Sequence, residues 1–141
     1  MILFVVDSSV ALKWFLEEED YADSARLLLD DEYELIAPDL FWPECGNILW
    51  KKVQRNELTA DKASLIRKGI EQQPITIFPS SLIVEPAIEI AFDTGASVYD
   101  CCYLALAMLY DCKMATADRK LMSALLYTKY SRHVLWIANL S

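Results

Sequence analysis

Ser97-Val98-Tyr99-Asp100-Cys101-Cys102-Tyr103-Leu104-Ala105-Leu106-Ala107 is an apolar stretch with a single acid near its start. The apolar run continues to residue 109, which is long enough for about three helical turns. Ser97 is a residue type that caps helix N-termini, so the pattern predicts a buried helix over 98–109 with Asp100 in its first turn. Such an acid has two interpretations. It accepts free backbone N–H groups at the helix start, or it belongs to a functional site.

Three further acids stand at the ends of predicted elements, and they favour the second interpretation. Asp7 follows the apolar run 2–6, and Asp118 follows a short strand predicted over 113–116. Glu44 lies in the first turn of another predicted helix. In open α/β sheets ligands bind where strands lead into helices, so we expect the four acids to share one site. Separate capping of four helices is the alternative.

Apolar, β-branched runs alternate along the chain with stretches of helical periodicity. This alternation predicts a single domain over residues 1–141, an α/β fold with a three-layer α/β/α sandwich and a mainly parallel sheet of about five strands. Pro38 is expected to end the second strand, and Asp39, Thr59, Ser80 or Ser81, and Asp118 to cap helices. Strands are expected at 2–6, 35–37, 75–78, 113–116 and 133–137, and helices at 9–15, 21–29, 40–53, 60–72, 82–94, 98–109 and 119–125.

The net charge of −8 argues against a general nucleic-acid-binding surface, because phosphate affinity normally comes from a surplus of Lys and Arg. The charge is unevenly distributed, however. Residues 1–44 carry 12 acids and 2 bases, whereas residues 45–141 carry 9 acids and 11 bases. A polyanion can therefore still bind such a chain if bound cations mask the acids.

Cysteine spacing and apolar run lengths indicate the cellular compartment. The four cysteines include no C-x-x-C pair, so they predict neither a zinc site nor a disulfide scaffold. No apolar run approaches the roughly 20 residues needed to span a bilayer. The N-terminal run is too short for a signal peptide and lacks a preceding basic segment. We therefore expect a cytoplasmic protein with no membrane segment.

Carboxylates that converge without countercharges repel one another by about 3 kcal/mol per pair at ~5 Å and an effective dielectric constant of 20. Hard divalent cations are the usual reason for such a cluster, since Mg²⁺ and Mn²⁺ prefer oxygen ligands and are commonly held by a few carboxylates. Such a metal can activate water and stabilise the charge of phosphodiester displacement. The acids therefore indicate a Mg²⁺ or Mn²⁺ site, with helix capping as the competing interpretation.

Four segments resemble, in this order, the successive motifs of PIN domains, and specifically those of the VapC-type toxins of prokaryotic toxin–antitoxin pairs. Each segment alone is a weak signal, but the four together are specific and span nearly the whole chain. They are residues 4–14 (FVVDSSVALKW), 37–47 (APDLFWPECGN), 99–107 (YDCCYLALA) and 115–121 (ATADRKL).

The resemblance implies a Mg²⁺- or Mn²⁺-dependent endoribonuclease that cleaves single-stranded RNA and is the toxin partner of a cognate antitoxin protein. The family's acidic quartet of metal-binding, catalytic residues is matched by Asp7, Glu44, Asp100 and Asp118, and its accessory polar positions by Ser8 and Thr116. The resemblance also points to a homodimer, as does the 55% hydrophobic content with several aromatic residues on predicted helix faces.

Three other functions are alternatives to a ribonuclease. A phosphatase of the haloacid-dehalogenase type needs a second Asp two residues after the first, and Ser9 stands there. A phospho-receiver module needs paired acids at the first strand, and Asp7 has no adjacent acid. A PIN scaffold that only binds partners is the remaining non-enzyme alternative. Metal-dependent cleavage of RNA would distinguish it from a nuclease.

Overall fold

The computed structural model describes residues 1–140 and contains a five-stranded sheet in which every strand runs parallel to its neighbours. The strand order is β3-β2-β1-β4-β5. The predicted mainly parallel sheet of about five strands is therefore confirmed. The strands are β1 (Ile2–Val6), β2 (Tyr33–Pro38), β3 (Ile75–Phe78), β4 (Lys113–Thr116) and β5 (Val134–Trp136).

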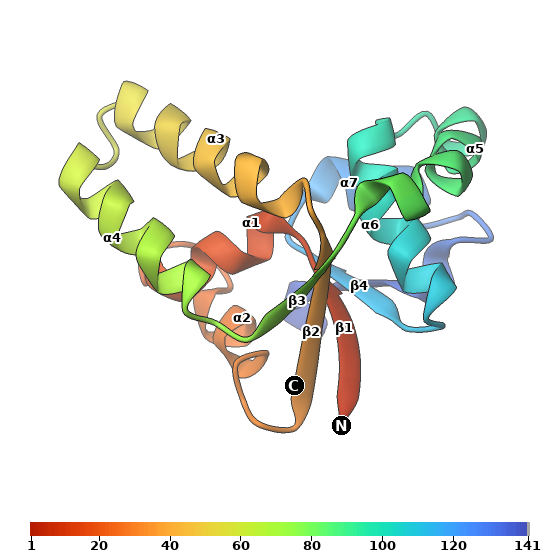
Figure 1. Ribbon diagram of the computed structural model, residues 1–141, viewed down its shortest axis with the longest axis horizontal. Coiled ribbons are helices and arrows are strands. Elements are labelled where there is room, and N and C mark those ends of the chain that lie inside the picture. The colour runs from red at the N-terminus through yellow and green to blue at the C-terminus, as the bar shows by residue number, and fades with distance from the viewer. Residues whose placement is uncertain (141) are drawn as a thin grey trace.

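Helices cover both faces of this sheet and complete the predicted three layers. Figure 1 shows α1, α2 and the α3–α4 hairpin on one side of the sheet, and α5, α6 and α7 on the other. The α-helices are α1 (Ser8–Ala11), α2 (Ala22–Leu27), α3 (Phe41–Gln54), α4 (Ala60–Glu71), α5 (Val84–Thr94), α6 (Val98–Leu109) and α7 (Arg119–Leu125). Short 3₁₀ turns are η1 (Leu12–Phe15), η2 (Ser80–Leu82), η3 (Ser131–His133) and η4 (Ile137–Asn139).

The connections change direction between β1 and β4. From β1 the chain moves outward to β2 and β3, and after α5 and α6 it returns to place β4 on the other side of β1. In parallel sheets such a reversal leaves a crevice at the carboxyl ends of the two strands, because the flanking connections leave toward opposite faces. The residues that follow β1 and β4 therefore face the same crevice.

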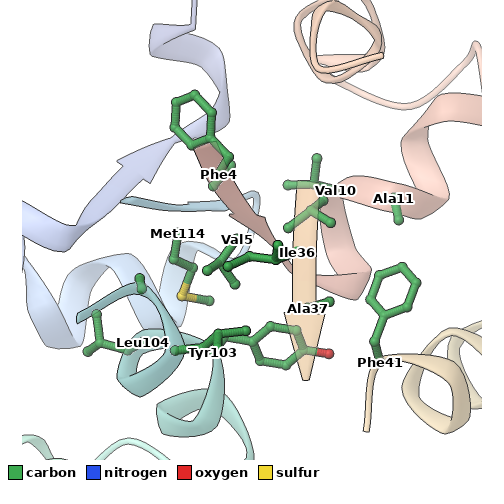
Figure 2. Packing of buried hydrophobic residues seen from close by; sticks show 14 of the residues in the cluster. Phe4, Val5, Val10, Ala11, Ile36, Ala37, Phe41, Tyr103, Leu104 and Met114 are labelled. Atoms are coloured by element: carbon green, nitrogen blue, oxygen red, sulfur yellow. The ribbon is translucent and has the colours of Figure 1, made fainter. Parts of the chain in front are cut away.

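Helix α6 is the buried helix that the opening stretch predicts. Every residue from Cys101 to Ala107 is buried, because α6 contacts β1, β2 and β4 on one side and α5 on another. A helix enclosed in this way is apolar around its whole circumference. Figure 2 shows Tyr103 and Leu104 of α6 among the sheet residues Val5, Ile36 and Met114.

The second strand is longer than predicted and includes Pro38. Its pairing with β1 ends at Ile36, whereas its pairing with β3 continues through Pro38. The N–H of Asp39 bonds Phe78 in β3, so the nitrogen of the preceding residue faces the β1 side, where pairing has already ended. A proline therefore removes no ladder hydrogen bond here, and the expected stop at residue 37 was wrong.

Several predicted helix boundaries also differ from the structure. Helix α3 begins without a side-chain cap, so the expected capping role of Asp39 was wrong. The serines at 80 and 81 form the turn η2 instead of capping α5, which begins at Val84. The helix expected over 9–15 tightens into η1 after Ala11, and α2 is shorter than the predicted 21–29. The caps at Thr59, Ser97 and Asp118 and the C-terminal Gly95 are confirmed.

The C-terminal strand is also shorter than predicted, and His133 precedes it in η3. The imidazole Nδ1 of His133 lies 2.9 Å from the carbonyl oxygen of Cys112. None of the helices in residues 1–140 combines the length and apolar character needed to cross a membrane.

Candidate functional site

Asp7 lies directly after β1 and is the most buried of the four acids, with 6% of its surface exposed. Its Oδ1 atom accepts hydrogen bonds from the backbone N–H of Val10 at 3.1 Å and from the Ser9 hydroxyl at 2.5 Å. Its Oδ2 atom accepts from the Thr116 hydroxyl at 2.6 Å. Asp7 therefore caps α1 with one oxygen and contacts the end of β4 with the other.

Burial makes the ionised form of Asp7 costly. It raises the pKa of Asp7 from its ordinary value near 3.8 to about 6, and the negative charge of Asp100 contributes in the same direction. The three hydrogen bonds lower this pKa without cancelling the effect of burial. The carboxylate is thus well supplied with hydrogen bonds but has no compensating positive charge.

Asp118 is held near Asp7 by the same polar groups. The Thr116 hydroxyl accepts a 3.1 Å hydrogen bond from the N–H of Asp118, and the Ser9 hydroxyl accepts one of 3.1 Å from the N–H of Ala117. Asp118 caps α7 through Oδ1, which accepts from the N–H of Leu121 at 3.1 Å. The turn after β4 is therefore tied directly to the turn after β1.

Asp100 and Glu44 are not helix caps. The hydroxyl of Ser97 caps α6 by accepting a 3.1 Å hydrogen bond from the N–H of Asp100. No backbone N–H bonds to the carboxylate of Asp100 or Glu44 within the described residues. Glu44, in the first turn of α3, instead accepts a 2.5 Å hydrogen bond from the Tyr103 hydroxyl. For these two acids the capping interpretation is wrong, whereas Asp7 and Asp118 both cap a helix and face the crevice.

All four acids line one pocket of about 450 Å³ at the crevice between β1 and β4. Burial first, and then the charge of Asp118, raises the pKa of Asp100. Burial first, and the charge of Asp100 with it, raises the pKa of Glu44. The pocket is lined by Asp7, Ser8, Ser9, Leu40, Pro43, Glu44, Asn47, Ile48, Lys51, Tyr99, Asp100, Tyr103 and Asp118.

The donor chemistry of this pocket fits a hard divalent cation. Across residues 1–140, no Lys or Arg forms a direct ion pair with any of the four carboxylates, although Lys51 lines the same pocket. Carboxylate oxygens are the ligands that Mg²⁺ and Mn²⁺ prefer. In the same residues no three Asp, Glu, His or Cys side chains are grouped closely enough to hold a metal ion together. A common ion would therefore require the carboxylates to move toward it.

The sequence of the chain matches a family model described as PIN domain over residues 4–124. The chain belongs to the PIN-domain family. A relative named Ribonuclease VapC3, from Pyrobaculum aerophilum, is 30% identical over 119 residues, which cover 83% of this chain and 90% of that protein. The VapC-type resemblance of the four motifs is thus confirmed.

Solved structures show the same PIN fold. The crystal structure of PAE2754 from Pyrobaculum aerophilum has a TM-score of 0.70 and 20% identity, and the match covers 94% of this chain and 83% of that one. A chain of a toxin–antitoxin complex from Klebsiella pneumoniae has a TM-score of 0.61 and 13% identity, with 95% and 97% covered. At these identities the likeness establishes the fold alone.

Two polar residues of this PIN-domain pocket, Ser9 and Asn47, were not among the site residues predicted from the sequence. Ser8 was predicted to support the acids, and it lines the pocket, but the serine hydroxyl that bonds Asp7 belongs to Ser9. The two-residue separation of Ser9 from Asp7 is typical of local side-chain bonding and could have indicated it. Asn47 and Lys51 follow Glu44 at helical spacings of three and seven residues, which also predicts one shared face of α3.

Proposed function

We propose that residues 1–141 form a single-domain endoribonuclease that cleaves phosphodiester bonds of single-stranded RNA and depends on Mg²⁺ or Mn²⁺. One observation carries the proposal: four carboxylates, none of which forms an ion pair within residues 1–140, line one pocket at the carboxyl ends of β1 and β4. A cluster of carboxylates without ion pairs has little structural benefit, because its charges repel one another. Membership of the PIN-domain family and the relative named Ribonuclease VapC3 support the same activity.

The four acids would bind the metal ion together. Asp7, Asp100 and Asp118 are the proposed direct ligands, and Glu44 would bind directly or through a water molecule. Bound there, a divalent cation lowers the pKa of water and stabilises the negative charge that develops during phosphodiester displacement. The accessory residues Ser8 and Thr116, joined by Ser9, would orient ligands and water, as hydrogen-bonding groups around metal ligands commonly do.

The rim of the pocket suits a single strand of RNA. Lys51 and Tyr99 line the pocket, and both are exposed, so a phosphate can meet the ammonium and a base can meet the phenol ring. Single-stranded RNA is commonly held by such pairs of a cation for the backbone and an aromatic ring for stacking. Asn47 adds an amide that can donate or accept hydrogen bonds.

We further propose that the protein is the toxin of a toxin–antitoxin pair in the cytoplasm, that it binds a cognate antitoxin and that it forms a homodimer. The VapC name of the curated relative and the toxin–antitoxin complex among the fold matches support the antitoxin. Several large apolar side chains are exposed, among them Phe92, Leu109 and Tyr127, which supports contact with other chains. Light scattering that gives a monomer at micromolar concentration would contradict the homodimer.

The activity is tested by incubating purified protein with an unstructured RNA in Mg²⁺ or Mn²⁺, with and without EDTA. We expect cleavage that requires metal and is lost in Asp118→Asn, while Asp111→Asn, an exposed acid outside the pocket, serves as the control. Cleavage that survives EDTA would contradict the metal dependence. No cleavage under any metal would favour a PIN scaffold that only binds partners.

A further inference from the structure

Tyr103 is the largest fully buried side chain of the core, with 1% of its surface exposed, yet its hydroxyl belongs to the acidic pocket. That hydroxyl lies 2.5 Å from Oε1 of Glu44, across 59 residues of sequence. A phenylalanine would fill the same apolar space beneath the sheet. The packing of the core therefore explains the ring but does not explain the hydroxyl.

The bond joins two elements that lie on opposite sides of the sheet. Tyr103 is on α6, one helical turn after Asp100, and Glu44 is in the first turn of α3. In Figure 2 the ring of Tyr103 passes beside Ala37 at the end of β2, and its hydroxyl points toward the side where Phe41 begins α3. The hydroxyl thus sets the position of Glu44 relative to the helix that carries Asp100.

The chemistry of the Tyr103–Glu44 pair identifies the hydrogen-bond donor and leaves one carboxylate oxygen without a hydrogen bond. An ionised carboxylate can only accept hydrogen bonds, so the phenol of Tyr103 donates and Glu44 accepts. Glu44 accepts through Oε1 alone, and Oε2 forms no hydrogen bond within the described residues. A hydrogen bond to one carboxylate oxygen restricts the orientations of the other oxygen. In Glu44 the other oxygen is Oε2, which can bind a ligand in the pocket.

We propose that Tyr103 is a positioning residue of the acidic site, whose hydroxyl holds Glu44 so that its second oxygen can bind the metal ion directly or through water. The inference rests on the proposed metal-dependent function. Groups that hydrogen-bond to metal ligands contribute about 10- to 100-fold to metal affinity. Loss of the Tyr103 hydroxyl should therefore weaken metal binding by a factor in that range.

A general loss of stability is the competing explanation, and the chain contains a matched control for it. Tyr130 is also buried, and its hydroxyl donates a 2.6 Å hydrogen bond to a carboxylate oxygen of Asp93. Neither Tyr130 nor Asp93 lines the acidic pocket. Tyr130→Phe therefore removes another partly buried phenol–carboxylate bond at a place where metal binding should not depend on it.

The experiment measures Mn²⁺ affinity by isothermal titration calorimetry for wild type, Tyr103→Phe, Tyr130→Phe, Glu44→Gln and the Tyr103→Phe, Glu44→Gln double variant. Circular dichroism checks that each variant is folded. We expect Tyr103→Phe to bind Mn²⁺ about 10- to 100-fold more weakly than wild type and Tyr130→Phe to bind like wild type. In the Glu44→Gln background, Tyr103→Phe should cause no further loss, because the residue through which it acts has been changed.

Equal affinities of wild type and Tyr103→Phe would overturn the inference. An equal loss in Tyr130→Phe, or the same additional loss in the Glu44→Gln background, would do so as well, because either result indicates an effect that does not pass through Glu44. A wild-type protein that binds no Mn²⁺ and cleaves no RNA would overturn the proposed function together with the inference. Wild-type binding with an unaffected Tyr103→Phe would overturn only the inference.

Discussion

The hydroxyl of Thr116 donates a 2.6 Å hydrogen bond to Oδ2 of Asp7, although 109 positions separate the two residues in the chain. The parallel register of β1 and β4 brings them together. Val6 pairs with Ala115, so Asp7, the residue after β1, lies beside Thr116, the last residue of β4. The fold therefore supplies a polar support for the most buried acid of the pocket.

We predict that Thr116→Val raises the pKa of Asp7 above its value of about 6, because the hydrogen bond from Thr116 favours the ionised carboxylate. The variant keeps the shape of the side chain, which is fully buried, but leaves the Asp7 carboxylate short of one donor and the Asp118 N–H without its acceptor. Unfolding free energy in EDTA should fall by about 1–3 kcal/mol at neutral pH. Carboxyl ¹³C NMR titration measures the pKa, and denaturation with urea measures the stability.

Thr116→Ser is the control for this change, because it keeps the hydroxyl and loses only a methyl group. The pKa of Asp7 in Thr116→Ser should stay close to the pKa of Asp7 in wild type. An unchanged Asp7 pKa in Thr116→Val would show that the bond contributes nothing to the ionisation of the site.

The raised pKa of Asp7 predicts how the stability of the metal-free protein depends on pH. Between about pH 4 and pH 6 the folded protein holds a proton on Asp7 that the unfolded chain has released. The free energy of unfolding should therefore fall as the pH rises through this window. A pKa near 6 instead of 3.8 corresponds to about 3 kcal/mol of destabilisation above pH 7.

Urea denaturation of wild type and Asp7→Asn in EDTA, at pH values between about 4 and 7.5, isolates this contribution. Asp7→Asn lacks the titrating group and should gain stability relative to wild type as the pH rises. Burial also raises the pKa values of Glu44 and Asp100, but these acids are present in both proteins. Parallel pH profiles for the two proteins would contradict the prediction.

At the start of α6, Asp100 lines the acidic pocket and Ser97 caps the helix. Variants of these two residues therefore distinguish a metal site from a helix cap. Asp100→Asn should melt higher than wild type in EDTA, because it removes a charge that faces Asp118 and Glu44. The same variant should lose most of the stabilisation that millimolar Mn²⁺ gives wild type through linked binding, and it should lose RNA cleavage.

Ser97→Ala provides the opposite pattern, since the Ser97 hydroxyl is the cap of α6. It should cost about 1 kcal/mol of stability with or without Mn²⁺ and leave the metal-induced shift in melting temperature unchanged. Thermal melts of the three proteins, each with EDTA and with Mn²⁺, make the comparison. Equal metal-induced shifts in melting temperature for wild type and Asp100→Asn would show that Asp100 has only a structural role.

Substitution of the helical glycines Gly46 and Gly69 by alanine should change the stability of the protein in opposite directions. A Cβ at Gly69 of α4 would lie 2.8 Å from two ring carbons of Phe15, so this glycine allows the α3–α4 hairpin to pack against η1. A Cβ at Gly46 of α3 meets nothing within 4 Å. Gly46→Ala should raise the free energy of unfolding by about 0.5–1 kcal/mol, because alanine loses less backbone entropy in a helix.

Gly69→Ala gains the same helix propensity but forces Phe15 to move, which typically costs about 1–3 kcal/mol in a packed interface. It should therefore be less stable than Gly46→Ala by at least about 1 kcal/mol. Urea denaturation of both variants beside wild type provides the measurement. Equal gains in both variants would show that Phe15 moves aside without cost.

Features of the fold that depend only on neighbouring residues could be predicted from the sequence. The alternation of strands and helices was predictable because apolar periodicity records which faces are buried. The caps at Thr59, Ser97 and Asp118 were predictable because each bond closes within three residues, where helical geometry alone sets the distance. The boundaries at Pro38 and at the 80–83 turn were not, since they depend on where a neighbouring strand ends and how a turn packs.

Which of the four acids are caps, and which side chains hold them, could be seen only in the folded molecule. Asp7 meets Thr116 through strand register, and Glu44 meets Tyr103 through the packing of two helices on opposite sides of the sheet. Contacts across 109 and 59 residues have no local signal, because the dihedral angles of one segment do not fix its distance from another. The residue types at the site were thus readable from the chain, whereas their hydrogen-bond partners were set by register and packing.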